Sequence, residues 1–210
     1  MKKIIPIIII VLIVIIIAIS CGSGDDEEKA TNTDTNTTTT EEATEPDKPE
    51  MTMAQENAYG SAKDYIDNGA FSKQGLLQQL TSEYGEGYEK KDARFAIKLL
   101  EKNREVNWKE EAAESAREYL DNGAFSKQGL LQQLTSDSGE GFTEKQARYA
   151  IKLIEKNGEV NWKEEAVESA REYLDNDSFS KQGLFEQLTS EYGEGFTEKQ
   201  ARYAVEKVYK

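Results

Sequence analysis

The sequence contains no histidine, and it has only one cysteine and three prolines in 210 residues. The lack of histidine removes the most common general base, the base of Ser–His and Cys–His nucleophile pairs, and the most common transition-metal ligand. The single cysteine, Cys21, cannot form a disulfide within the chain. These absences disfavour an enzyme, and we expect no catalytic residue, no cofactor and no metal site.

Basic residues are also scarce. Lys and Arg number 26 against 40 Asp and Glu, which gives a formal net charge of −14. Residues 22–50 hold ten acidic residues but only Lys29 and Lys48, whereas residues 51–210 intersperse 30 acidic with 22 basic residues. Nucleic-acid binding needs a concentrated basic face. We therefore expect no nucleic-acid partner.

The first twenty residues have the layout of a signal peptide. Lys2 and Lys3 precede the apolar run Ile4–Ile19, and Ser20-Cys21 follows. Residues 18–21 resemble a bacterial lipobox, whose cysteine is acylated and becomes the first residue of the mature protein, although Ala18 stands where leucine is usual. We predict a lipoprotein signal peptide at 1–20 and lipidation of Cys21, for example by palmitate; the alternative is an uncleaved membrane anchor. Both place the remainder at the outer face of the cytoplasmic membrane.

The segment after Cys21 has the composition of an unfolded chain. Residues 22–50 are rich in Thr, Asp, Glu and Asn and contain no aromatic or branched aliphatic residue. Such a segment cannot bury enough apolar surface to offset its chain entropy. We expect 21–50, with the lipidated Cys21 at its start, to be a disordered acidic linker.

The rest of the chain repeats with a fixed period of 54 residues. Phe71, Phe125 and Phe179 recur at this spacing, as do Gly75, Gly129 and Gly183. A fixed period of this kind is the signature of a repeat array. We place three copies at residues 51–106, 107–160 and 161–210, and expect the last to be a capping repeat.

Each copy has the apolar spacing of three helices. In the second copy, Ala112, Ala116, Tyr119 and Leu120 mark the first helix, and Leu130, Leu131 and Leu134 mark a short second helix capped by Ser126. Thr143 and Gln146 form a capping-box pattern that begins the third helix, and Asn161 begins the next copy with another. Gly129 is expected to let a second backbone approach. The predicted fold is therefore all-α.

Several apolar residues lie away from the core stripe of these helices. They are expected to pack between consecutive copies, with partner binding as the alternative: Phe95, Leu99, Trp108, Tyr149, Leu153 and Trp162. In the last copy the positions of Phe95 and Leu99 are taken by Tyr203 and Lys207, so this face becomes half polar where no further copy follows. That change is what a capping repeat requires.

An ordered set of residues resembles the Ltp family, the host cell surface-exposed lipoproteins. In the second copy the set runs through Ser115-Ala116, Tyr119-Leu120, Phe125-Ser126, Gly129-Leu130, Gln133-Leu134, Ala147-x-Tyr149-Ala150 and Val160-x-Trp162, and it recurs in the other copies. The resemblance implies small three-helix, helix-turn-helix-like domains on a lipoprotein, often encoded by prophages of Gram-positive bacteria. It also implies superinfection exclusion, in which a later phage adsorbs but its DNA does not enter, with the tape-measure protein or tail tip as target.

This chain differs from the family pattern in having three units and longer acidic loops, at residues 83–87, 137–141 and 191–195. Carboxylates beside glycines could bind calcium, but these loops lack the ligand spacing of an EF-hand, so we expect solvated loops. The candidate partner-binding residues are Glu86, Glu140, Glu194 and Tyr203. Acidic repeats would attract a basic or amphipathic segment of a tail protein. The alternative function is a cell-wall-binding or spacer array without a phage role, and we expect a monomer.

Overall fold

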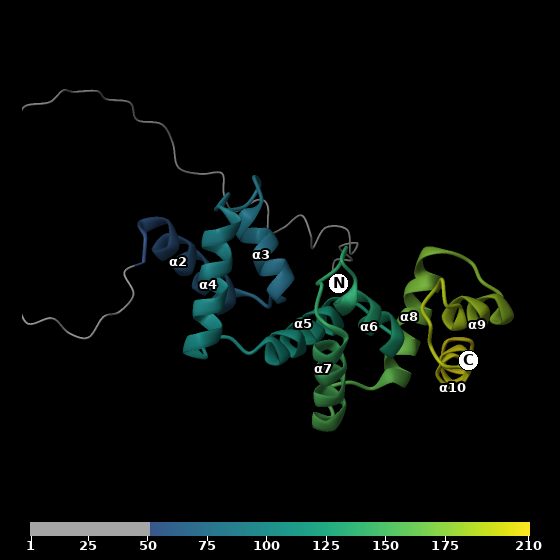
Figure 1. Cartoon of the computed structure of the whole chain (residues 1–210). Coiled ribbons are helices and arrows are strands. Elements are labelled where there is room, and N and C mark those ends of the chain that lie inside the picture. Colours follow the sequence, from purple (N-terminus) through teal and green to yellow (C-terminus); the bar gives the residue numbers. More distant parts are fainter. Residues whose placement is uncertain (1–50) are drawn as a thin grey trace, which may run out of the picture. The chain divides into compact units, whose positions relative to one another are not determined.

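The computed structural model describes residues 51–210, and every regular element in this part of the chain is an α-helix (Figure 1). The all-α class and the tandem arrangement are thereby confirmed. The predicted signal peptide at 1–20, the lipidation site Cys21 and the linker at 21–50 lie outside the described residues. Of the helices described, none is long and apolar enough to cross a membrane.

The helices form three successive groups of three, one group per copy (Figure 1). Their bounds are α2 Met53–Asn68, α3 Lys73–Thr81 and α4 Lys90–Asn103; α5 Trp108–Asn122, α6 Lys127–Thr135 and α7 Glu144–Asn157; α8 Trp162–Asn176, α9 Lys181–Thr189 and α10 Glu198–Val208. In each copy the first and third helices pack along one another, and the short second helix packs against both. We use first, second and third copy for these groups.

Local sequence signals begin these helices. The side chains of Ser72, Ser126 and Ser180 cap the second helices by accepting the backbone N–H three residues ahead. Thr143 and Gln146 form the predicted capping box on α7. Asn161 caps α8 through Lys163 N–H only, so the second predicted box is a simple N-cap. Each cap contributes about 1 kcal/mol to helix stability.

Each copy has its own apolar core. In the second copy the core includes Ala112, Ala116, Leu130, Leu134, Ala147, Ile151 and Ile154, all fully or almost fully buried. Tyr119 and Phe125 close it with an edge-to-face ring contact at 5.5 Å between centroids. Trp108 packs against the core of the first copy although it belongs to the second, and Trp162 packs against the second copy's core in the same way. Consecutive cores are therefore joined through one tryptophan.

The third copy covers its own end. Glu101 and Glu155 in the first two copies correspond to Tyr209 in the third. The Tyr209 hydroxyl donates to the Phe179 carbonyl at 2.5 Å, and the Lys181 ammonium lies 5.5 Å from the Tyr209 ring centroid. Tyr209 thus contacts the start of α9 in its own copy, and the role of the third copy as a capping repeat stays a prediction.

Candidate partner-binding surface

The three acidic loops are ordered by backbone hydrogen bonds. In the second copy Gly139 and Gly141 donate to the Ser136 carbonyl at 3.0 Å, and Phe142 donates to the Leu134 carbonyl at 2.8 Å. Gly141 has a φ of 68°, a left-handed conformation that favours glycine. A Cβ at Gly139 would lie 2.3 Å from the Gln133 carbonyl oxygen, so this position admits no side chain. The glycines fix the loop conformation.

The glutamates predicted to bind a partner are held by tyrosines of their own copy. Glu86, Glu140 and Glu194 accept the hydroxyls of Tyr65, Tyr119 and Tyr173 at 2.8, 2.6 and 2.7 Å. Each hydroxyl in turn accepts from a glutamine Nε2, at 3.0 Å from Gln79 and 2.9 Å from both Gln133 and Gln187. Burial, followed by the adjacent Glu194, raises the pKa of Tyr173 to about 12. These carboxylates therefore anchor the loops.

The loops of the second and third copies are exposed at their tips but partly covered at their ends. Glu140 and Glu194 are half-buried, whereas Glu86 is exposed. The cause is contact with the preceding copy: Ser126 Oγ donates to the Glu194 carbonyl at 2.5 Å, and Gln74 Nε2 donates to Asp137 Oδ1 at 3.2 Å. Among the described residues no copy precedes the first, and Glu86 in its loop is exposed.

The backbone of the next copy lies against Gly129, at a distance that a Cβ would meet as an ordinary van der Waals contact. A Cβ at Gly129 would lie 3.6 Å from the Glu194 carbonyl oxygen, and at Gly75 it would lie 3.7 Å from that of Glu140. The close approach of a second backbone was predicted at Gly129 and is confirmed. Ser126 is 1% exposed as a result, whereas Ser180, with no following copy, is exposed.

The tryptophans complete the junction between copies. Trp108 and Trp162 donate from Nε1 to Glu101 and Glu155, each at 2.8 Å. The same Glu155 carboxylate accepts from the Lys127 ammonium at 2.6 Å. Burial alone would raise the pKa of Glu155, but the hydrogen bonds from Lys127 and Trp162 lower it overall. For both tryptophans the predicted contact between copies is present.

Two further junction carboxylates were missed by sequence reasoning. Glu111 Oε2 accepts from Phe71 N–H at 3.5 Å, and Glu165 Oε2 accepts from Phe125 N–H at 3.3 Å. Burial raises the pKa of both, and that of Glu165 reaches about 7. One feature of the sequence indicated their role: the matching position in the first copy is Asn57, and no other copy precedes the first.

The contacts found for the other aromatic and aliphatic residues assigned to the junction lie within their own copies. The Tyr149 hydroxyl donates to Glu110 at 2.8 Å, and Lys109 lies 5.1 Å from its ring centroid, both within the second copy. Leu153 packs against the core of its own copy. These contacts lie within the copy because α7 packs along α5, and packing of Tyr149 and Leu153 between copies stays a prediction. Phe95 and Leu99 are half-buried at the matching positions of α4.

Tyr203 repeats the pattern of Tyr149. Its hydroxyl donates to Glu164 at 2.9 Å, and its ring lies 5.0 Å from Lys163 and 5.2 Å from Lys207. The structure therefore places this candidate partner-binding residue between two ammonium groups of the third copy, with part of its ring exposed.

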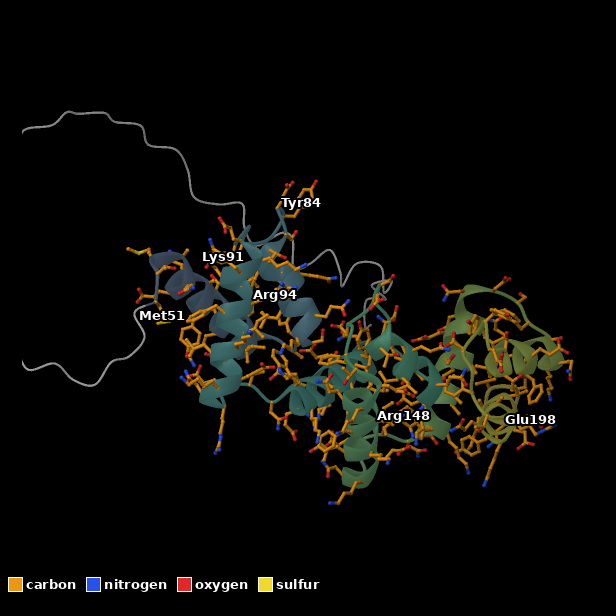
Figure 2. The ribbon with its side chains drawn as sticks, viewed as in Figure 1. Met51, Tyr84, Lys91, Arg94, Arg148 and Glu198 are labelled. Atoms are coloured by element: carbon orange, nitrogen blue, oxygen red, sulfur yellow. The ribbon has the colours of Figure 1, made fainter. Side chains whose placement is uncertain are left out.

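Tyrosines at two loop tips are the most exposed aromatic residues of the described part. Tyr84 is 82% exposed and Tyr192 102% exposed, and Figure 2 shows Tyr84 at the end of its loop. The second copy has Ser138 at the same position. Neither ring contributes to the core, so both are available to a partner. Among residues 51–210 no group of three or more Asp, Glu, Cys or His side chains is arranged to hold a metal ion.

Linked copies of one helical unit, each with an ordered loop, define a tandem-repeat protein. The family model of the host cell surface-exposed lipoproteins matches three times, at residues 54–100, 107–154 and 161–208. The chain belongs to this family.

One solved structure is similar to part of the array. It is that of Ltp, a superinfection exclusion protein from the Streptococcus thermophilus temperate phage TP-J34. The two chains are 26% identical, and the match covers 49% of this chain and 97% of the other with a TM-score of 0.42. Among curated protein sequences, none matches this chain.

Proposed function

We propose that this chain is a lipid-anchored protein of the bacterial cell surface that excludes superinfecting phages. It binds a component of the incoming tail, the tape-measure protein or the tail tip, and stops the DNA from entering. The observation that carries the proposal is the threefold match to the surface lipoprotein family. The similarity to a protein described as a superinfection exclusion protein supports it. The role is binding rather than catalysis.

The membrane anchor in this proposal comes from the predicted lipoprotein signal peptide and the cysteine that follows it. Acylation of Cys21 holds the chain at the outer face of the cytoplasmic membrane of a Gram-positive-type cell, where injected tail proteins arrive. Replacing this residue, as in Cys21→Ser, removes the acceptor thiol. The protein is then expected in the soluble fraction or as an uncleaved precursor, and exclusion is expected to fall because the array is no longer held at the membrane. Fractionation with labelled fatty acid tests this; unchanged labelling would contradict it.

The loop tips provide the contact surface in this proposal. Tyr84 and Tyr192 are exposed and lie next to Glu83 and Glu191. Tyrosine is enriched at protein interfaces because it combines a large apolar area with few rotatable bonds. The acidic excess of the array attracts a basic or amphipathic tail segment over long range. Tips on separate copies engage one elongated target together and increase the apparent affinity.

The experiment compares phage adsorption with DNA entry in a sensitive host that expresses the full chain. Adsorption is expected to be normal and DNA entry blocked.

The double variant Tyr84→Ser/Tyr192→Ser is expected to restore much of the DNA entry, because it removes both exposed rings. The second copy has a serine at this position, so the loop tolerates this side chain. Ser138→Ala is the matched control and leaves exclusion unchanged. Normal DNA entry at a verified surface level would contradict the proposal, and binding to purified peptidoglycan instead would favour a spacer role.

A further inference from the structure

A groove of about 580 Å³ lies where the second copy meets the third. Leu131 from α6 supplies its accessible apolar part, Ile151 from α7 lies beneath with 2% of its surface exposed, and Thr197 at the start of α10 closes the side of the third copy. Lys127, Arg148 and Lys152 also line it. Arg148 is labelled in Figure 2. We refer to this site as the α7 groove.

A second groove of about 480 Å³ adjoins the first and shares two of its residues. Arg148 and Lys152 line both, and Lys109, Lys145 and Tyr149 are added in the second. Ile151 and Tyr149 are two positions apart on α7, so they lie on nearly opposite sides of this helix. Arg148 and Lys152 lie between them and are shared by the two grooves.

The two grooves concentrate positive charge in an acidic protein. Five cationic side chains line them, against the single carboxylate of Glu144. Arg148 pairs with Glu144 at 2.6 Å, and Lys127 pairs with Glu155 at 2.6 Å. Lys145 and Lys152 form no ion pair with any residue that the structure describes. These exposed ammonium groups are free to meet carboxylates of a ligand.

The third copy shows that the three-helix fold does not require this combination of cationic and apolar residues. Lys152 corresponds to Glu206 and Leu131 to Phe185. The Arg202 guanidinium lies 4.9 Å from the Phe185 ring centroid, and the matching groove is only about 300 Å³. The same three helices therefore fold with one charge reversed and the apolar part occupied by a larger ring.

We propose that the α7 groove binds an acidic amphipathic helix of a partner protein. Apolar side chains of that helix contact Leu131, and its carboxylates meet Arg148 and Lys152, which line this groove. Grooves between helices bind amphipathic helices in this way. A nucleic acid is disfavoured, because an apolar floor offers nothing to a phosphate backbone and residues 51–210 carry eight more acidic than basic residues. The ligand has the opposite charge to the one attracted by the acidic loops, so this is a separate binding surface and does not depend on the proposed function.

The test is fluorescence anisotropy with the full chain in detergent. The probe is a labelled helical peptide of about 18 residues, roughly five turns, with Leu at i, i+3, i+4 and i+7 and Glu elsewhere. Saturable binding is expected for this peptide. A shuffled peptide of equal composition, a version with Lys for Glu, and a DNA duplex are expected to bind at least about tenfold more weakly.

The variant Lys152→Glu introduces the residue that the third copy has at this position. It is expected to weaken peptide binding about tenfold while the melting temperature stays within a few degrees. Lys156→Glu makes the same charge change on α7 outside the groove, and it is the matched control with nearly unchanged binding. Equal loss in both variants, equal binding of the shuffled peptide, stronger binding of DNA, or no peptide binding at all would each overturn the proposal.

Discussion

At the scale of single residues, the position that ends the third helix of a copy is an arginine in the first copy and a glycine in the second. The residue after α4 is Arg104 with a φ of 60°, and the residue after α7 is Gly158 with a φ of 71°. Both donate their N–H back to the last turn of the helix. A left-handed conformation costs a non-glycine residue about 1 kcal/mol. The first copy therefore retains local strain that the second avoids.

Arg104→Gly is expected to stabilise the first copy by about 0.5–1 kcal/mol, since the relief of strain outweighs the added freedom of the unfolded chain. The measurement is the free energy of unfolding in denaturant. Gly158→Arg is the mirror control and is expected to destabilise by a similar amount, because no atom lies within 4 Å of the added Cβ and only the backbone conformation matters. An unchanged or lower stability for Arg104→Gly would contradict this account.

At the scale of helices and loops, the same N-cap serine exists in a covered and an open form. Ser126 accepts from Gly129 N–H and also donates to the Glu194 carbonyl of the next copy. Ser180 accepts from Gly183 N–H and has no following copy to contact. The pair separates the helix-capping role of this residue from its role in the junction.

Ser180→Ala is expected to cost about 1 kcal/mol, the value of one N-cap. Ser126→Ala is expected to cost about 1 kcal/mol more, since it also leaves the Glu194 carbonyl without its donor. Thermal and denaturant unfolding of the two variants measure the difference. Equal losses would show that the hydrogen bond between copies contributes nothing to stability.

The junction also makes stability depend on pH through Glu165. Its pKa is about 7 in the folded chain, because burial disfavours the carboxylate, against an ordinary value of 4.5. The folded state thus takes up this proton before the unfolded state as the pH falls. The contribution is fully present below about pH 4.5 and is lost as the pH rises through about 7. Glu111, whose pKa burial also raises, acts in the same direction.

Glu165→Gln is expected to raise the melting temperature at pH 8 and to flatten the decrease in stability between pH 5 and pH 8. The amide carries no charge and keeps a carbonyl oxygen for Phe125 N–H. Glu206→Gln, on an exposed position of α10, controls for the removal of one charge. A melting profile with the slope of the unsubstituted chain would rule out a titrating junction carboxylate.

At the scale of the whole molecule, the sequence predicts the copies better than it predicts their junctions. Helices and caps follow from spacing within about ten residues, so the serine caps and the box at Thr143 were predictable. The junction depends on contacts such as Ser126 with the Glu194 carbonyl, 68 residues away. Every residue has a backbone carbonyl, so the sequence does not indicate which carbonyl makes such a contact. For Tyr149, periodicity gives the face of the helix but not the neighbour that covers it, and the contacts found lie within its own copy.

Trp162 is the side chain that couples the third copy to the core of the second. Repeat arrays owe their cooperativity to such nearest-neighbour contacts, and a copy of about 50 residues is marginal by itself. Trp162→Ala removes a half-buried ring and its hydrogen bond to Glu155. It is expected to lower the melting temperature, at a cost of about 2–3 kcal/mol, and to let the third copy unfold first.

Calorimetry of the full chain distinguishes this loss of coupling from general destabilisation. Trp162→Ala is expected to give a broadened or two-step transition, with a calorimetric enthalpy above the van't Hoff enthalpy. Tyr149→Ala removes a ring whose hydrogen bond and cation contact lie within the second copy, so it is expected to lower the midpoint while leaving the shape of the transition unchanged. If both variants broaden the transition equally, Tyr149 also couples copies and its contacts within α5 and α7 are not its main contribution.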